Sequence, residues 1–200
     1  MRKVTPVQYK KAAVMVHGKS ERFLASYIYT NLHLPVVIID KNKGRSSIQI
    51  NALKNILSSK PYNSLKSFAE EYSIEYDRKE KKLKNFKLFI IMDTDDCSDK
   101  TREDYISGKL FGDSYLKEYI VPIFNSPNLE EVMIKSGIMA KIIPDSQKGS
   151  YYSKIFPINQ DPFSNDTLDQ IRLFSRKLEN VKETNLLEYV HYCLSLINQV

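Results

Sequence analysis

Short runs of apolar residues that favour strands alternate along this chain with longer stretches in which apolar residues recur at helical spacing. The runs cover residues 12–16, 34–39, 88–92 and 119–124. Runs of this length that end at polar residues are typical of strands covered on both faces. Strands alternating with helices predict an α/β domain with a mainly parallel, four-stranded sheet and right-handed crossovers. Pro122 indicates an edge position for the fourth strand, because proline cannot donate a ladder hydrogen bond.

The stretches between the runs divide into predicted helices and less regular segments. Residues 58–87 read as an insertion with one helix, residues 100–116 as a mobile loop with a short helix, and residues 144–162 as a loop. We expect residues 1–140 to form one α/β domain, and residues 141–200 to add a loop and two helices that pack on it. The helices predicted from apolar spacing cover residues 20–28, 48–57, 65–72, 129–133, 168–178 and 187–197.

Composition limits the classes of protein to which the chain can belong. Two hundred residues with 42% hydrophobic content can bury a substantial core. No apolar stretch approaches the roughly 20 residues that span a bilayer, and the start of the chain lacks the apolar middle of a secretory signal. We therefore expect a cytoplasmic protein without a membrane partner. The two cysteines have no partners at metal-ligand spacing, so we expect reduced thiols.

The charge of the chain favours a polyanionic partner. The net charge is +6 and the pI is near 9.1, as is common for proteins that bind nucleic acid. The densest basic run, residues 78–87, could contact phosphates or could form a solvated face.

Polar residues follow each predicted strand. His17, Asp40, Asp93 and Asn125 all come at or just after a strand's carboxyl end, where open parallel sheets bind their ligands. Asp95 follows Asp93 by two positions, so the two carboxylates can point the same way and share a divalent cation.

The acid pair alone leaves several kinds of site open. A phosphatase with an aspartate nucleophile and a nucleotide-sugar transferase with a metal-binding Asp-x-Asp both fit it. A phosphate-binding loop at Gly18 is excluded because Ala13 stands where that motif needs glycine. A calcium loop fits poorly because Cys97 and Ser98 stand where a ligand and a glycine belong.

The combination of motifs resembles a known family. A strand followed by His17-Gly18-Lys19-Ser20-Glu21, with a later strand that ends at Asp93-Thr94-Asp95, resembles the Toprim domain of topoisomerases, primases and overcoming-lysogenization-type nucleases. The stretch from Asn125 to Glu130 resembles the later motif of the RloB-like branch, although Asn125 and Ser126 stand in swapped order and Leu129 replaces an aromatic residue. The resemblance covers roughly residues 10–140.

This resemblance implies a Toprim-like, Rossmann-like fold and a metal-dependent nuclease that acts on nucleic-acid phosphodiesters, in a setting such as phage defence. It implies Mg²⁺ or Mn²⁺ on Asp93 and Asp95, and it aligns Glu130 with the acid of the later motif. In the family, a glutamate directly before the glycine acts as general acid or base, whereas His17 stands at that position here. Histidine can move a proton near neutral pH, but it offers no carboxylate to magnesium.

Other residues could complete this site. Glu21 could take over the proton transfer, and its ordinary role would be to stabilise a helix N-terminus. Lys19 and the basic insertion could neutralise flanking phosphates, and Asp40, Asn125 and Glu130 are further candidates for substrate contact. The alternative is a catalytically degenerate, Toprim-like module that binds nucleic acid, or that binds a protein partner or a second copy through its C-terminal helices.

Overall fold

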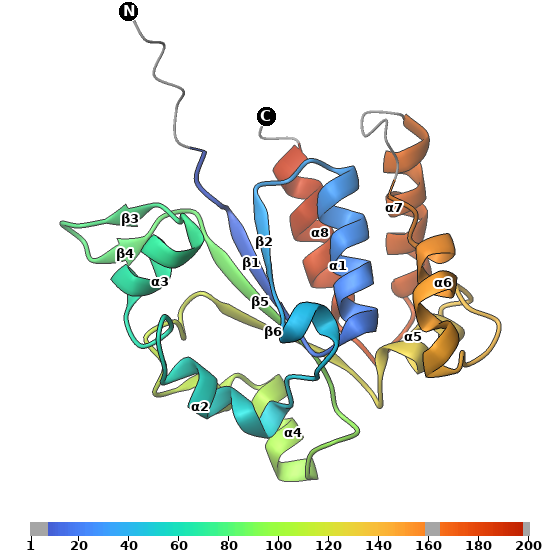
Figure 1. The fold of residues 1–200 in the computed structure, drawn as a ribbon, viewed down its shortest axis with the longest axis horizontal. Helices are drawn as coiled ribbons and strands as arrows, with labels where there is room; N and C mark the ends of the chain where they lie inside the picture. The colour runs from blue at the N-terminus through green and yellow to red at the C-terminus, as the bar shows by residue number, and fades with distance from the viewer. Residues whose placement is uncertain (1–7, 159–164, 198–200) are drawn as a thin grey trace, which may run out of the picture.

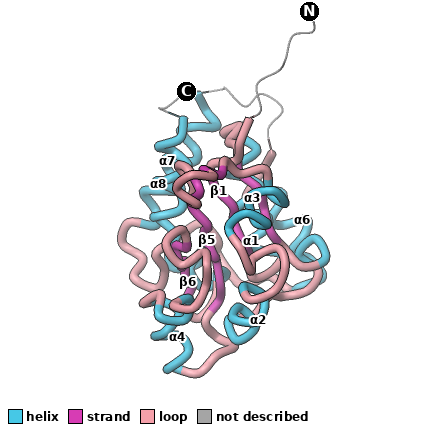
Figure 2. The backbone as a smooth tube through the Cα atoms, turned by 90° about the vertical axis from the view of Figure 1, so that its left-hand side faces the viewer, coloured by secondary structure: helices cyan, strands magenta, loops and turns pink. Residues whose placement is uncertain are grey.

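A parallel sheet of four strands forms the centre of the molecule (Figure 1). The computed structural model describes residues 8–158 and 165–197. The sheet order is β2-β1-β5-β6, and Figure 2 shows β1, β5 and β6 running side by side. The predicted α/β class with a four-stranded parallel sheet is therefore confirmed. The strand bounds are Ala12–Val16 for β1, Val36–Ile39 for β2, Lys87–Asp93 for β5 and Ile120–Asn125 for β6.

Helices cover both faces of the sheet, so alternate residues of β1 enter two different cores. Val14 belongs to the core under α1, α5, α6, α7 and α8, and Met15 belongs to the core under α2, α3 and α4. Figure 1 shows α1 and α8 on one side and α2, α3 and α4 on the other. Burial on both faces explains why the strands read as continuous apolar runs. The helix bounds are Lys19–Asn31 (α1), Leu53–Leu57 (α2), Leu65–Tyr72 (α3), Asp99–Ile106 (α4), Leu129–Lys135 (α5), Asp145–Ile155 (α6), Asn165–Leu178 (α7) and Leu186–Ile197 (α8).

The segment 144–162, which was expected to be a loop, is largely helical, and residues 100–116 contain the expected short helix and a further helical turn. The helix α6 occupies most of the predicted loop 144–162, of which residues 159–162 lie outside the described residues. Tyr152 of α6 and Phe156, the residue after this helix, are both buried, but the polar residues before them conceal the helical period. In residues 100–116, α4 and the short 3₁₀ helix η3 (Lys109–Phe111) bury Tyr105 and Phe111.

The insertion lies at the amino-terminal end of the sheet. After α3 it forms a hairpin of β3 (Tyr76–Asp77) and β4 (Lys82–Leu83). The Leu83 N–H donates to the hydroxyl of Tyr119, just before β6, and the Lys10 N–H, just before β1, donates to the carbonyl of Ser73. The basic insertion, which could neutralise flanking phosphates, therefore lies at the opposite end of the strands from Asp93.

The predicted edge position of Pro122 is confirmed, since β6 is the last strand of the sheet. Residues 183–185 run beside the end of this strand. The N–H of Phe124 donates to Asn185 Oδ1 at 2.9 Å, and the N–H of Ser126 donates to the carbonyl of Glu183 at 2.8 Å. Among the helices of residues 8–158 and 165–197, none combines the length and apolarity needed to span a membrane.

Candidate functional site

A cleft of about 470 Å³ opens at the carboxyl ends of β1 and β5. The turn between β1 and α1, the loop after β2, and the helices α5 and α6 contribute its other walls. Of the residues predicted from sequence, it brings together His17, Lys19, Glu21, Asp93 and Glu130. Its remaining lining residues are Gly18, Ser20, Gly44, Arg45, Ser47 and Lys148.

Glu21 lies at the floor of this cleft, where it is only 1% exposed. The turn at Gly18 starts α1, and the Gly18 N–H donates to Glu21 Oε2 at 2.9 Å. The second oxygen, Oε1, is buried without a hydrogen-bond partner. Burial, together with the nearby charge of Glu130, raises the pKa of Glu21 to about 7. Glu21 therefore has one oxygen held by the backbone and one available to a ligand or a proton.

Asp93 is the last residue of β5 and is also buried. Its Oδ1 accepts hydrogen bonds from Asn125 Nδ2 at 3.2 Å and from the Leu129 N–H at 3.0 Å. Thr184 donates to Asn125 Oδ1 at 3.0 Å, which directs the amide nitrogen of Asn125 toward Asp93. Burial, and then the Glu21 carboxylate, raise the pKa of Asp93 well above its usual value. Asn125 thus acts on the site through Asp93 and does not line the cleft.

Glu130 differs from these two acids because three donors converge on its Oε1. They are the Ser20 hydroxyl at 2.8 Å, the Lys148 Nζ at 2.8 Å and the Tyr152 hydroxyl at 3.2 Å. Burial alone would raise the pKa of Glu130, but the hydrogen bonds from Lys148 and Ser20 outweigh it and hold the pKa below its usual value. The cleft therefore contains acids whose pKa values are pushed apart, as in sites that carry out acid–base chemistry.

The other predicted residues have different positions. Asp95 is exposed, accepts a hydrogen bond from Asn128 Nδ2 at 3.2 Å and does not line the cleft. Asp40 also lies outside the lining and forms an ion pair with Arg22 at 2.7 Å. His17, the residue after β1, lines the cleft, and its Nδ1 is buried without a hydrogen-bond partner.

The acids at the floor offer oxygen ligands to a hard cation. Among the described residues, no group of three or more His, Cys, Asp or Glu side chains is arranged so that it could hold a metal ion. Magnesium in proteins usually keeps several waters and binds through one or two carboxylates and the substrate's phosphate. Of the two predicted metal ligands, Asp93 lines the cleft and Asp95 does not, so Asp93 alone of this pair fits that pattern.

Sequence reasoning missed several residues of this region. Arg45, Ser47 and Lys148 line the cleft, and their signal was only that of polar loop residues. The hydrogen bond from Tyr152 to Glu130 depends on the folding of α6, so the sequence pattern does not reveal it. Both carboxylate oxygens of Asp96 are buried without a hydrogen-bond partner, and burial raises its pKa.

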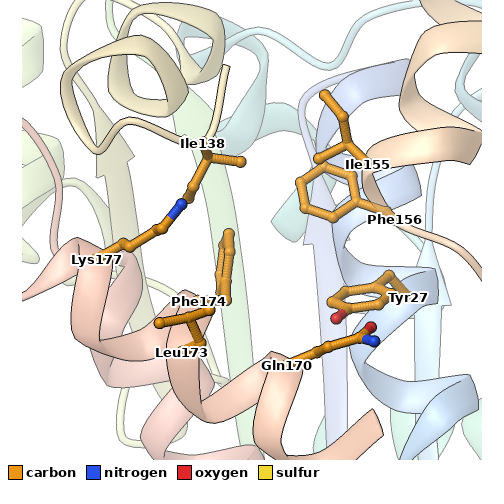
Figure 3. Close-up of a pocket in the computed structure, with 8 residues that line it drawn as sticks. All are labelled: Tyr27, Ile138, Ile155, Phe156, Gln170, Leu173, Phe174 and Lys177. Atoms are coloured by element: carbon orange, nitrogen blue, oxygen red, sulfur yellow. The ribbon is translucent and has the colours of Figure 1, made fainter. Parts of the chain in front are cut away.

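A second hollow of about 160 Å³ lies between α7 and the pair α1 and α6. Figure 3 shows the Phe174 ring of α7 opposite the rings of Tyr27 of α1 and Phe156 after α6. Its described lining is mainly apolar, so we assign no acid–base chemistry to it.

Comparison with known proteins adds no relative of this chain. No family model matches it, and no curated protein or solved structure matches it either.

Proposed function

We propose that the protein is a metal-dependent nuclease of Toprim type, which cleaves nucleic-acid phosphodiesters with Mg²⁺ or Mn²⁺. The observation that carries this proposal is the cleft itself, in which carboxyl groups of Glu21, Asp93 and Glu130 converge from three elements beneath a cationic mouth. A site that cleaves a phosphodiester needs both positive and negative groups. Cations bind the phosphate oxygens, and carboxylates hold the metal ion or move protons.

The roles of the chain's own residues follow from their environments. Asp93, held by Asn125 and the Leu129 N–H, would be the fixed metal ligand. When bound, the divalent ion would supply charge stabilisation of the phosphate and a more acidic water. Glu21 would accept or return a proton through its buried Oε1, which has no hydrogen-bond partner. In the Toprim family a glutamate at the position of His17 transfers the proton. Here Glu21, one helical turn further along, would take over that role.

Cleavage of labelled DNA and RNA with Mg²⁺, Mn²⁺ or EDTA tests the proposal. Asp93→Asn and Glu21→Gln should each abolish metal-dependent cleavage, whereas Asp113→Asn, at an exposed acid outside the cleft, should retain it. Mn²⁺ should also raise the melting temperature of the wild type and should not raise that of Asp93→Asn. Cleavage that survives in Asp93→Asn would contradict the mechanism.

A non-catalytic nucleic-acid-binding module is the second candidate. It is favoured by the arrangement of the side chains, because among the described residues no group of three or more His, Cys, Asp or Glu is placed to hold a metal ion. His17→Glu separates the two candidates. Activity that is absent from the wild type and appears in this variant would identify a degenerate site, and a loss of existing activity would identify His17 as a working residue.

A further inference from the structure

Two lysine side chains from distant parts of the chain line the cleft. Lys148 of α6 places its Nζ 2.8 Å from Glu130 Oε1, and its side chain is 23% exposed. Lys19, the first residue of α1, extends toward the same helix, and its Nζ lies 3.2 Å from the position that a Cβ on Gly149 would take. Both lysines line the cleft, so two ammonium groups flank one opening.

Gly149 allows the Lys19 side chain to come close to α6. Glycine inside a helix is less favourable than alanine, because its backbone loses more freedom on folding. Gly149 lies in the middle of α6, where alanine would ordinarily be the better residue. A methyl group there would be in tight contact with the Lys19 ammonium. The missing side chain therefore leaves space for the positive charge of Lys19.

The opposite wall of the mouth adds a third cation. Arg45 and Ser47 line the cleft from the loop after β2. This loop is fixed against the β1–α1 turn, because the Ile48 N–H donates to the carbonyl of His17 at 2.8 Å. The buried Gly44 packs there as well, with its Cβ position 3.2 Å from the Cα of Lys19. Cations from three elements therefore line one cleft, and an anion placed between them would relieve their mutual repulsion.

We infer that Lys19, Lys148 and Arg45 form a phosphate-binding subsite at the mouth of the cleft, and that Gly149 sets the position of Lys19 in it. Ammonium groups bind phosphate as point charges, and a guanidinium can bind it with two parallel hydrogen bonds. The inference rests on the proposed function, since the phosphate would belong to the nucleic acid whose neighbouring linkage faces the carboxylates. It makes α6, which lies outside the Toprim-like region, part of the substrate site.

Binding of a labelled single-stranded oligonucleotide in EDTA, followed by fluorescence anisotropy, tests the subsite without metal chemistry. Lys148→Ala should weaken binding about tenfold, the loss expected for one charged hydrogen bond. It should also reduce the slope of log affinity against log salt by about 0.7, the value for one lost contact to a single strand. Lys154→Ala, an equal change of charge at an exposed position of α6, should have little effect. Equal losses in the two variants would overturn the inference, because they would indicate diffuse attraction only.

The same assay shows whether the bound phosphate is a terminal phosphate or an internal linkage of the oligonucleotide. A preference for an oligonucleotide with a 5′-phosphate would assign the subsite to a terminal phosphate, and equal affinity with and without it would assign the subsite to an internal linkage. Inorganic phosphate should compete in either case, more weakly against Lys148→Ala than against the wild type. Competition that is equal in both proteins would contradict a phosphate site at Lys148.

Gly149→Ala provides a test in which folding and binding should change in opposite directions. Alanine should raise the melting temperature, because it favours the helix, and it should weaken oligonucleotide binding severalfold by displacing the Lys19 ammonium. Ser150→Ala, at the next and exposed position, is the matched control and should not weaken binding. Unchanged affinity in Gly149→Ala would refute the role given to this glycine.

The two proposals can fail separately. Asp93→Asn should still bind the oligonucleotide in EDTA while it loses cleavage. If the wild type never cleaves nucleic acid but Lys148→Ala still weakens binding selectively, the nuclease proposal fails and the phosphate subsite stands. If cleavage depends on Asp93 and binding is insensitive to Lys148, the phosphate subsite fails and the nuclease proposal stands.

Discussion

Glu21→Gln should change how the stability of the protein depends on pH. The folded state raises the pKa of Glu21 from 4.5 to about 7, so between these two values the folded chain binds a proton more tightly than the unfolded chain. The free energy of unfolding must then fall as the pH rises through this window. Each tenfold change in proton affinity corresponds to about 1.4 kcal/mol, so ionising Glu21 should cost the folded state about 3 kcal/mol by pH 8.

Glutamine keeps an oxygen for the Gly18 N–H but cannot ionise. The difference in unfolding free energy between Glu21→Gln and the wild type should therefore grow in favour of the variant by about 3 kcal/mol between pH 4 and pH 8. The loss of the Glu21 charge should also lower the pKa of Asp93, which acts in the same direction. Urea denaturation at several pH values measures this difference, with the exposed Glu103→Gln as control. Parallel curves for Glu21→Gln and the wild type would refute the reasoning.

Two further substitutions test how the site is supported. Tyr105→Phe should lower the free energy of unfolding by about 1–3 kcal/mol, because the buried hydroxyl bonds two carbonyl oxygens of β5 and β6; Tyr115→Phe, at a 66% exposed residue, should leave it unchanged in urea denaturation. Gly44→Ala should cost about 1 kcal/mol more than Gly108→Ala, since both glycines have φ near +75° but only at Gly44 would the added Cβ meet the Lys19 backbone. Equal losses in the two glycine variants would show that backbone strain alone determines the effect.

The sequence predicted the part of the site that depends on strand ends. His17 and Asp93 are neighbours because parallel strands finish at one edge, and this follows from the buried runs before them. The pairing of Asp93 with Asp95 could not be judged in the same way. The Thr94 N–H donates to the carbonyl oxygens of Asn125 and Pro127, so the chain turns there and carries Asp95 away from the cleft.

The contribution of α6 to the site could not be predicted from the pattern of apolar and polar residues. Lys148 meets Glu130 through folding of a segment whose own apolar period is weak, and Ser20 meets Glu130 across 110 positions of sequence. Local propensity carries no information on which distant polar groups will pair. Such pairs follow only from packing in three dimensions, and here they hold Glu130 ionised.

The segment 183–185 beside β6 also has a consequence for association between molecules. A strand at the edge of a sheet presents unpaired backbone groups that can pair with another chain. Here Asn125 forms an antiparallel bridge with Thr184, and the N–H groups of Phe124 and Ser126 are already bonded to the same segment. The carboxyl end of β6 is thus covered by the protein's own chain. This local cover should discourage strand addition and aggregation at the point where Asn125 must stay directed toward Asp93.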